Sequence, residues 1–199
     1  MTHRWVDELD VGFGWLLEER ATRTSHALAD DGRVWLIDPL DVPGLDDRLR
    51  GLGEPAGVVQ LLDRHNRDGA VLAARNGVPH HVVPASLPGT PFELVPLVGR
   101  RIWREAALWW PQRRILVCAD AVGTNRFFAG GDALGVHPFL RALPPRVLGR
   151  YEPLHLLVGH GEGLHGEGAA AALQRALATA RTGVPRWLGA VVTGRGRAV

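Results

Sequence analysis

The chain has 199 residues, of which 46% are hydrophobic and 22% are charged, and a composition of this kind is typical of a folded globular protein. All 23 basic residues are arginines, so chemistry that needs a lysine, such as a Schiff base or a phosphate-binding loop, is excluded. The net charge is only +2 and the arginines are scattered along the chain, so nucleic acid is not expected as a partner.

The single cysteine, Cys118, lies in the apolar stretch ILVCAD and has no second cysteine with which to form an internal disulfide. A lone buried thiol is compatible with a reducing compartment. No apolar stretch reaches the roughly 20 residues that cross a bilayer, and the N-terminus lacks the apolar core of a signal peptide. We therefore expect a cytoplasmic protein without membrane contact.

Strands and helices alternate along the first half of the chain. Residues 24–39, TSHALADDGRVWLIDP, predict two strands joined by a tight turn, because Asp-Gly suits the positive dihedral angles of a hairpin. Residues 42–53, VPGLDDRLRGLG, have a proline near their start and a glycine at their end, and this order predicts a short helix. The apolar run 57–63 predicts a strand that is buried on both faces. A short helix over 68–77 then ends at Asn-Gly.

The second half continues the same alternation. Further strands are predicted at residues 79–85, 91–98, 105–110, 114–120 and 155–159. Residues 167–183, EGAAAALQRALATARTG, predict the longest helix, because alanine is the best helix former and Gly183 ends the run. No linker divides the chain, so we predict one mixed α/β domain over residues 1–199, with a flexible tail from about residue 190.

Acidic and histidine side chains follow three of the apolar strands. Asp63 and His65 close the strand at 57–63, and Asp68 follows where the chain enters the next helix. Asp120 closes ILVCAD and His160 closes HLLVGH. Because open α/β sheets bind their ligands at the carboxyl ends of strands, these residues predict one site. Imidazole and carboxylate groups together suit zinc, iron or manganese.

Each of these residues also has a purely structural interpretation. Asn66 or Asp68 suits the N-cap of the helix that begins near Gly69. Asp120 suits a turn, and the segment GHGEG suits a flexible glycine loop before the last long helix. The order and position of the residues together favour a metal site, because no single motif does so alone.

With these residues in place, the chain resembles the metallo-β-lactamase fold family. Its members carry a hairpin that ends in an Asp-containing strand, here VWLIDP, and then a strand that leads into His-x-His-x-Asp-His, here LLDRHNRD. A strand that ends in a metal-bridging Asp follows, here VCADAVG, and a late strand ends in Gly-His, here LLVGHGEG. The resemblance spans about residues 10 to 180 and identifies the chain as a short, divergent member.

The signature is only partly kept. Asp63 replaces its first histidine, His65 is retained, Arg67 replaces the aspartate and Asp68 replaces the last histidine. The mid-chain histidine of the family is missing, and Glu105 in WREAALWW lies near its expected position. The resemblance therefore implies the reduced ligand set Asp63, His65, Asp68, Asp120 and His160. This set suits one divalent metal, since the guanidinium of Arg67 brings a positive charge to the place of a second cation.

The resemblance implies a four-layer αββα sandwich of two mixed sheets, with the site at the edge where the sheets meet. It also implies metal-dependent hydrolysis, in which the metal, zinc first and iron or manganese next, polarises the scissile group and lowers the pKa of its bound water to about 7. Asp68 is the candidate base that orients the water, and Arg67 is the candidate to pair with buried carboxylates or with an anionic substrate group.

The sequence does not choose among ester, thioester, phosphodiester and lactam substrates. A small molecule is the expected partner, and a homodimer is an open alternative. The main alternative function is a non-catalytic family member that has lost the dinuclear site and binds a small molecule or a protein partner.

Overall fold

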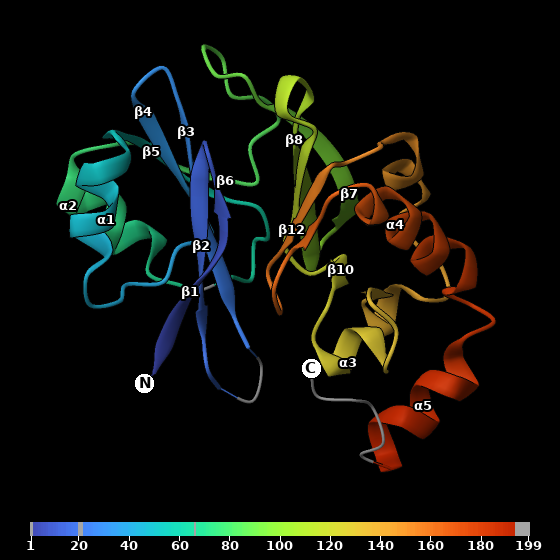
Figure 1. Cartoon of the computed structure of the whole chain (residues 1–199). Helices are drawn as coiled ribbons and strands as arrows, with labels where there is room; N and C mark the ends of the chain where they lie inside the picture. Colours follow the sequence, from blue (N-terminus) through green and yellow to red (C-terminus); the bar gives the residue numbers. More distant parts are fainter. Residues whose placement is uncertain (1, 20–21, 66, 194–199) are drawn as a thin grey trace.

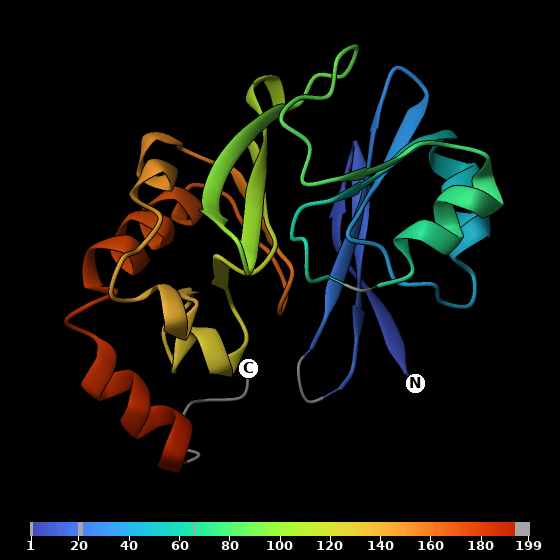
Figure 2. The same ribbon diagram turned by 180° about the vertical axis from the view of Figure 1, so that it is seen from behind.

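The computed structural model describes residues 2–19, 22–65 and 67–193 (Figure 1). Two β-sheets lie face to face, and helices cover the outer face of each sheet, as both views show (Figures 1 and 2). The predicted four-layer αββα sandwich is confirmed. Within the described residues, no helix combines the length and the apolar character needed to span a membrane.

The first sheet contains six strands in sequence order. They are β1 (His3–Leu9), β2 (Gly12–Leu17), β3 (Thr24–Asp30), β4 (Arg33–Ile37), β5 (Glu54–Gln60) and β6 (His80–Val82). β1 to β4 are antiparallel neighbours, whereas β4, β5 and β6 run parallel. Helices α1 (Leu45–Leu52) and α2 (Gly69–Asn76) make the crossovers and pack on the outer face. Burial on both faces explains the apolar run in β5, where Val58 and Val59 are inaccessible.

The second sheet has the strand order β13-β12-β9-β8-β7. Its strands are β7 (Glu93–Arg100), β8 (Trp103–Trp110), β9 (Ile115–Cys118), β12 (His155–Val158) and β13 (Leu164–His165). β9 and β12 are parallel neighbours, and the other pairs are antiparallel. Helix α4 (Gly168–Thr179) packs on the outer face. A small ribbon of β10 (Val122–Gly123) and β11 (Gly135–Val136), with α3 (Arg126–Ala129), extends from the carboxyl end of β9.

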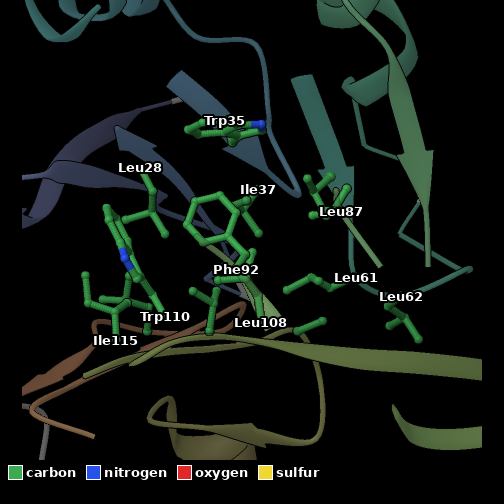
Figure 3. Close-up of a cluster of buried hydrophobic side chains, with 14 of the residues drawn as sticks. Leu28, Trp35, Ile37, Leu61, Leu62, Leu87, Phe92, Leu108, Trp110 and Ile115 are labelled. Carbon is green, nitrogen blue, oxygen red and sulfur yellow. The ribbon is translucent and has the colours of Figure 1, made fainter. Parts of the chain in front are cut away.

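The main core lies between the two sheets (Figure 3). Phe92 contacts Trp35 of the first sheet at a ring distance of 5.2 Å and Trp110 of the second sheet at 5.3 Å, both edge to face. Aromatic pairs in this arrangement stabilise a core beyond the area they bury. The apolar face of each sheet is thus covered by the other, which fixes their relative position.

The longest elements that the prediction missed lie at the two ends of the chain. Strands β1 and β2 lie in a region for which no strand was predicted. Helix α5 (Val184–Thr193) was also missed; the flexible tail predicted from about residue 190 overlaps its last residues, and residues 194–199 lie outside the described part. The predicted helix over 167–183 is α4, which is shorter and ends at Thr179.

Candidate metal centre

Strand register brings two of the predicted ligands together. In the parallel pair of β9 and β12, Cys118 is opposite Val158. Asp120 and His160 each follow two residues later, so they leave the sheet at the same level. His65 comes from the first sheet, five residues after the end of β5. The three side chains therefore meet at the edge between the two sheets, where the sequence predicted the site.

The oxygen Oδ1 of Asp120 lies at the centre of this group. It is 3.0 Å from Nε2 of His65 and 3.1 Å from Nε2 of His160. The donor atoms of the three residues all lie within 4.8 Å of one another. Their side chains are 9%, 14% and 15% exposed for His65, Asp120 and His160 respectively, so the group is sheltered but reaches solvent.

This donor set fits one metal ion. A tetrahedral metal with bonds of about 2.1 Å holds its ligand atoms about 3.4 Å apart, slightly farther than the distances found here. Small rotations of the side chains suffice to open the group by this amount. The same distances also suit two imidazole N–H groups that donate hydrogen bonds to one carboxylate oxygen. The set of two imidazoles and one carboxylate matches zinc, iron and manganese chemistry.

The electrostatics of the group favour the charged carboxylate. Burial alone would raise the pKa of Asp120, but hydrogen bonds and the nearby His160 and His65 hold it far below its ordinary range. Burial and the Arg67 guanidinium lower the pKa of His65, whereas the carboxylates of Asp38 and Asp120 raise it by more. The net pKa of His65 is therefore raised. Asp120 thus stays a negatively charged ligand throughout the physiological pH range.

Asp38 is a site residue that the ligand prediction missed. It follows β4, it is 4% exposed, and its Oδ2 lies 3.2 Å from Nδ1 of His65, an ion-pair distance without hydrogen-bond geometry. Its Oδ1 accepts a hydrogen bond from the amide of Leu61 at 3.1 Å. A carboxylate behind a ligating histidine fixes the orientation of the ring. The signal was present in VWLID, since Asp38 closes an apolar strand as Asp120 does.

Glu105 supports the site from behind. It lies in β8 and is 1% exposed. Its Oε1 accepts the backbone N–H groups of Asp120 and Ala121 at 2.8 and 2.7 Å, and its Oε2 accepts Nε1–H of Trp103 at 2.9 Å. Burial and the neighbouring Asp120 raise the pKa of Glu105 to about 7. Because these donors occupy both oxygens, Glu105 holds the loop that carries Asp120 and does not belong to the group of three.

Arg67 lies between the ends of strands from both sheets. Its guanidinium donates hydrogen bonds to the carbonyl oxygen of Thr24, to that of Asp38 at 2.9 Å and to that of Gly159 at 3.1 Å. The predicted pairing with buried carboxylates is electrostatic, with Asp38 and Asp120, while the hydrogen bonds go to backbone carbonyls. Burial lowers the pKa of Arg67, while the carboxylates of Asp38 and Asp120 counteract this shift. The guanidinium thus places a positive charge beside the carboxylates of Asp38 and Asp120.

Asp63 and Asp68 lie outside the group of three, so the predicted convergence of Asp68 with His65, Asp120 and His160 is wrong. Oδ2 of Asp68 accepts the amide N–H of Asp41 at 2.8 Å and thereby holds the loop after β4. Asp68 is also the N-cap residue of α2, although its side chain makes no capping bond. Oδ2 of Asp63 lies 3.5 Å from Nε of Arg104. Asn66, the other cap candidate, lies outside the described residues.

Comparison with solved structures supports the fold. The chain is similar to DIM-1 metallo-β-lactamase, with a TM-score of 0.61, 18% identity, and 90% of this chain and 97% of that chain covered. It is similar to a metallo-β-lactamase from Pontibacter korlensis, with a TM-score of 0.63, 13% identity and coverage of 89% and 99%. For TMB-1 the TM-score is 0.63, the identity 12% and the coverage 92% and 98%. No protein-family model and no curated protein matches the chain. The chain has the metallo-β-lactamase fold, and at these identities the likeness shows the fold alone.

Proposed function

We propose that the chain is a metal-dependent hydrolase with a single divalent metal, zinc first among the candidates, held by His65, Asp120 and His160. The observation that carries this proposal is the convergence of these three donor groups from two sheets, within 4.8 Å of one another. A metal held there supplies Lewis acidity for the hydrolysis of a carbonyl or phosphoryl group. Ester, thioester, phosphodiester and lactam substrates all fit this chemistry.

The chain's own residues prepare the site. Asp38 orients the His65 ring from behind, and Glu105 fixes the backbone on which Asp120 stands. Arg67 supplies the positive charge that a second metal would otherwise bring. Asp63 and Asp68 lie outside the group of three and are not ligands in our proposal, since Asp68 holds the Asp41 amide and Asp63 lies against Arg104.

Metal analysis tests this proposal on protein purified without a histidine tag. We expect about one zinc per chain, and we expect Asp120→Asn to weaken zinc binding by about 100-fold or more, because it removes the central charged ligand atom. Competition with a fluorescent zinc chelator measures the affinity. Asp10→Asn is the matched control, since Asp10 pairs with Arg113 on the surface and should leave the affinity unchanged. Asp63→Asn and Asp68→Asn should also leave the zinc affinity unchanged, because both residues lie outside the group of three.

Hydrolysis of p-nitrophenyl acetate, bis(p-nitrophenyl) phosphate, a thioester and a lactam should follow metal loading. Turnover that is lost in Asp120→Asn supports the hydrolase. Wild-type protein that binds no zinc, manganese or iron contradicts it.

The second candidate is a non-catalytic member of the fold that binds a small molecule. Arg67 and Glu105 favour it, because the guanidinium and the carboxylate are both committed to the protein's own backbone. Zinc binding without turnover of any of the four substrate classes would support this alternative.

A further inference from the structure

His137 is a buried histidine next to the metal centre that takes no part in the metal group. It directly follows β11, and its backbone N–H donates to the carbonyl of Ala121 at 3.0 Å. Ala121 is the neighbour of Asp120 in the chain. The backbone of His137 is therefore fixed one hydrogen bond away from the loop that carries the central ligand.

Aromatic side chains hold the His137 ring. Its centroid lies 4.9 Å from that of Trp103 and 5.2 Å from that of Phe128, both edge to face. Phe128 in turn stacks on His160 at 5.2 Å with an interplanar angle of 21°. Trp103 donates to Glu105, which holds the Asp120 loop. Trp103 and Phe128 thus form an aromatic wall that positions His137 and also contacts the residues around the metal group.

The hydrogen bonds of His137 define which nitrogen carries the proton. Its Nδ1 accepts the backbone N–H of Phe139 at 3.2 Å, so in the neutral ring the proton is on Nε2. Within the described residues, no partner accepts a hydrogen bond from this Nε2–H. Burial lowers the pKa of His137 to about 4, which agrees with a neutral ring at pH 7. His137 therefore offers a fixed N–H donor, and its Nε2 is not among the buried polar atoms that lack a partner.

We propose that His137 is a substrate-binding residue of the metal centre, and that its Nε2–H donates a hydrogen bond to a carbonyl or phosphoryl oxygen of the substrate. This inference rests on the proposed function, because the oxygen must be brought to His137 by a group bound at the metal. A neutral donor held in place by packing suits this task, since it needs no reorganisation when charge develops on the oxygen.

Binding of two probes to the zinc-loaded full chain tests the inference. Acetohydroxamic acid presents a carbonyl oxygen to a metal, and inorganic phosphate presents phosphoryl oxygens. We expect His137→Phe, which keeps the ring packing but removes the donor, to weaken the binding of at least one probe about 10-fold, as calorimetry can measure. His137→Gln keeps an N–H donor and should restore most of the affinity. His81→Gln is the control, because His81 lies on β6 away from this wall.

The probe that His137→Phe binds more weakly than wild type shows whether the substrate oxygen is acyl or phosphoryl. Equal behaviour of wild type and His137→Phe toward both probes, with zinc bound, overturns the inference and leaves the proposed function standing. If the wild-type protein binds no zinc, both the proposed function and this inference are contradicted. Nitrogen-15 NMR of the histidine rings gives a readout without activity or metal, because a proton on Nδ1 of His137 at pH 7 would also overturn the inference.

Discussion

The Arg67 guanidinium donates hydrogen bonds to backbone carbonyls at the ends of three strands. The carbonyls of Thr24, Asp38 and Gly159 belong to the start of β3, the end of β4 and the end of β12, so one guanidinium bridges both sheets. The carbonyls of Asp38 and Gly159 also accept hydrogen bonds from the Ser25 hydroxyl at 2.8 Å and from the Thr24 amide at 2.9 Å, and Arg67 adds a charged donor to each. Arg67 thus has a structural task that does not depend on metal binding.

Replacing Arg67 should therefore be costly. We expect Arg67→Met to lower the free energy of unfolding by about 3–5 kcal/mol, because it removes three buried charge-assisted hydrogen bonds to backbone carbonyls and the positive charge beside the Asp38 carboxylate. Urea unfolding of the metal-free protein measures this change. Arg104→Met is the control and should change the free energy by less than about 0.5 kcal/mol, since Arg104 is exposed and pairs only loosely with Asp63 at 3.5 Å. Equal stability of the two variants would contradict the bridging role.

Among elements, β1 was missed and yet carries a contact that joins the sheets. Oδ1 of Asp7 in β1 accepts the N–H of Gly163 at 2.8 Å and lies 3.0 Å from Nε2 of His165 in β13, while Oδ2 lies 3.1 Å from Nε2 of His26 in β3. Asp7 is 8% exposed. Although burial would raise the pKa of Asp7, the hydrogen bonds from His165 and His26 lower it far below its ordinary value of 3.8. The carboxylate of Asp7 fastens the edge of one sheet to the edge of the other.

This contact predicts a loss of stability in acid. Because the pKa of Asp7 is lower in the folded than in the unfolded chain, its contribution is complete above about pH 5 and is lost progressively as the pH falls through its ordinary value of 3.8 toward its folded value. We expect Asp7→Asn to lower the free energy of unfolding at pH 7 by about 2–4 kcal/mol and to flatten the slope against pH below pH 4. Denaturant unfolding between pH 3 and pH 7 measures both effects. Asp31→Asn, in the exposed β3–β4 turn, should keep the wild-type slope.

Two of the missed elements, β2 and α5, form against the local preference of their sequence. Gly12 in β2 approaches the β3 backbone so closely that a Cβ atom there would lie 2.1 Å from the carbonyl oxygen of Ala27. The glycine therefore serves close strand packing, whereas in the sequence it resembles a turn residue. Helix α5 contains Pro185, Gly189 and β-branched residues, which all have low helix propensity. Tertiary contacts form both elements against their local preference.

For the molecule as a whole, the cluster between the two sheets is, of the three buried hydrophobic clusters in the described residues, the one that joins the sheets. Trp110 of the second sheet is 1% exposed and lies in this core (Figure 3). We expect Trp110→Ala to lower the free energy of unfolding by about 3–5 kcal/mol, since it leaves a large cavity between the sheets. Thermal and urea unfolding measure the loss. Val71→Ala is the control, because Val71 on α2 is 59% exposed and should change stability little. A loss of less than about 1 kcal/mol in Trp110→Ala would contradict this account of the core.

The sequence by itself determined the alternation of strands and helices, and with it the places where Asp120, His160 and His65 leave their strands. Apolar strands and their polar ends are local patterns, so residue order was enough to predict them. Only the tertiary structure decided which acids meet, because Cβ directions beyond a strand end depend on the loop backbone and on the register between strands of different sheets. Asp38, with its positive φ of 45°, turns toward His65, whereas Asp68 turns toward Asp41. The partners of Arg67 are backbone carbonyls, which every residue carries, so no pattern of side chains could have revealed them.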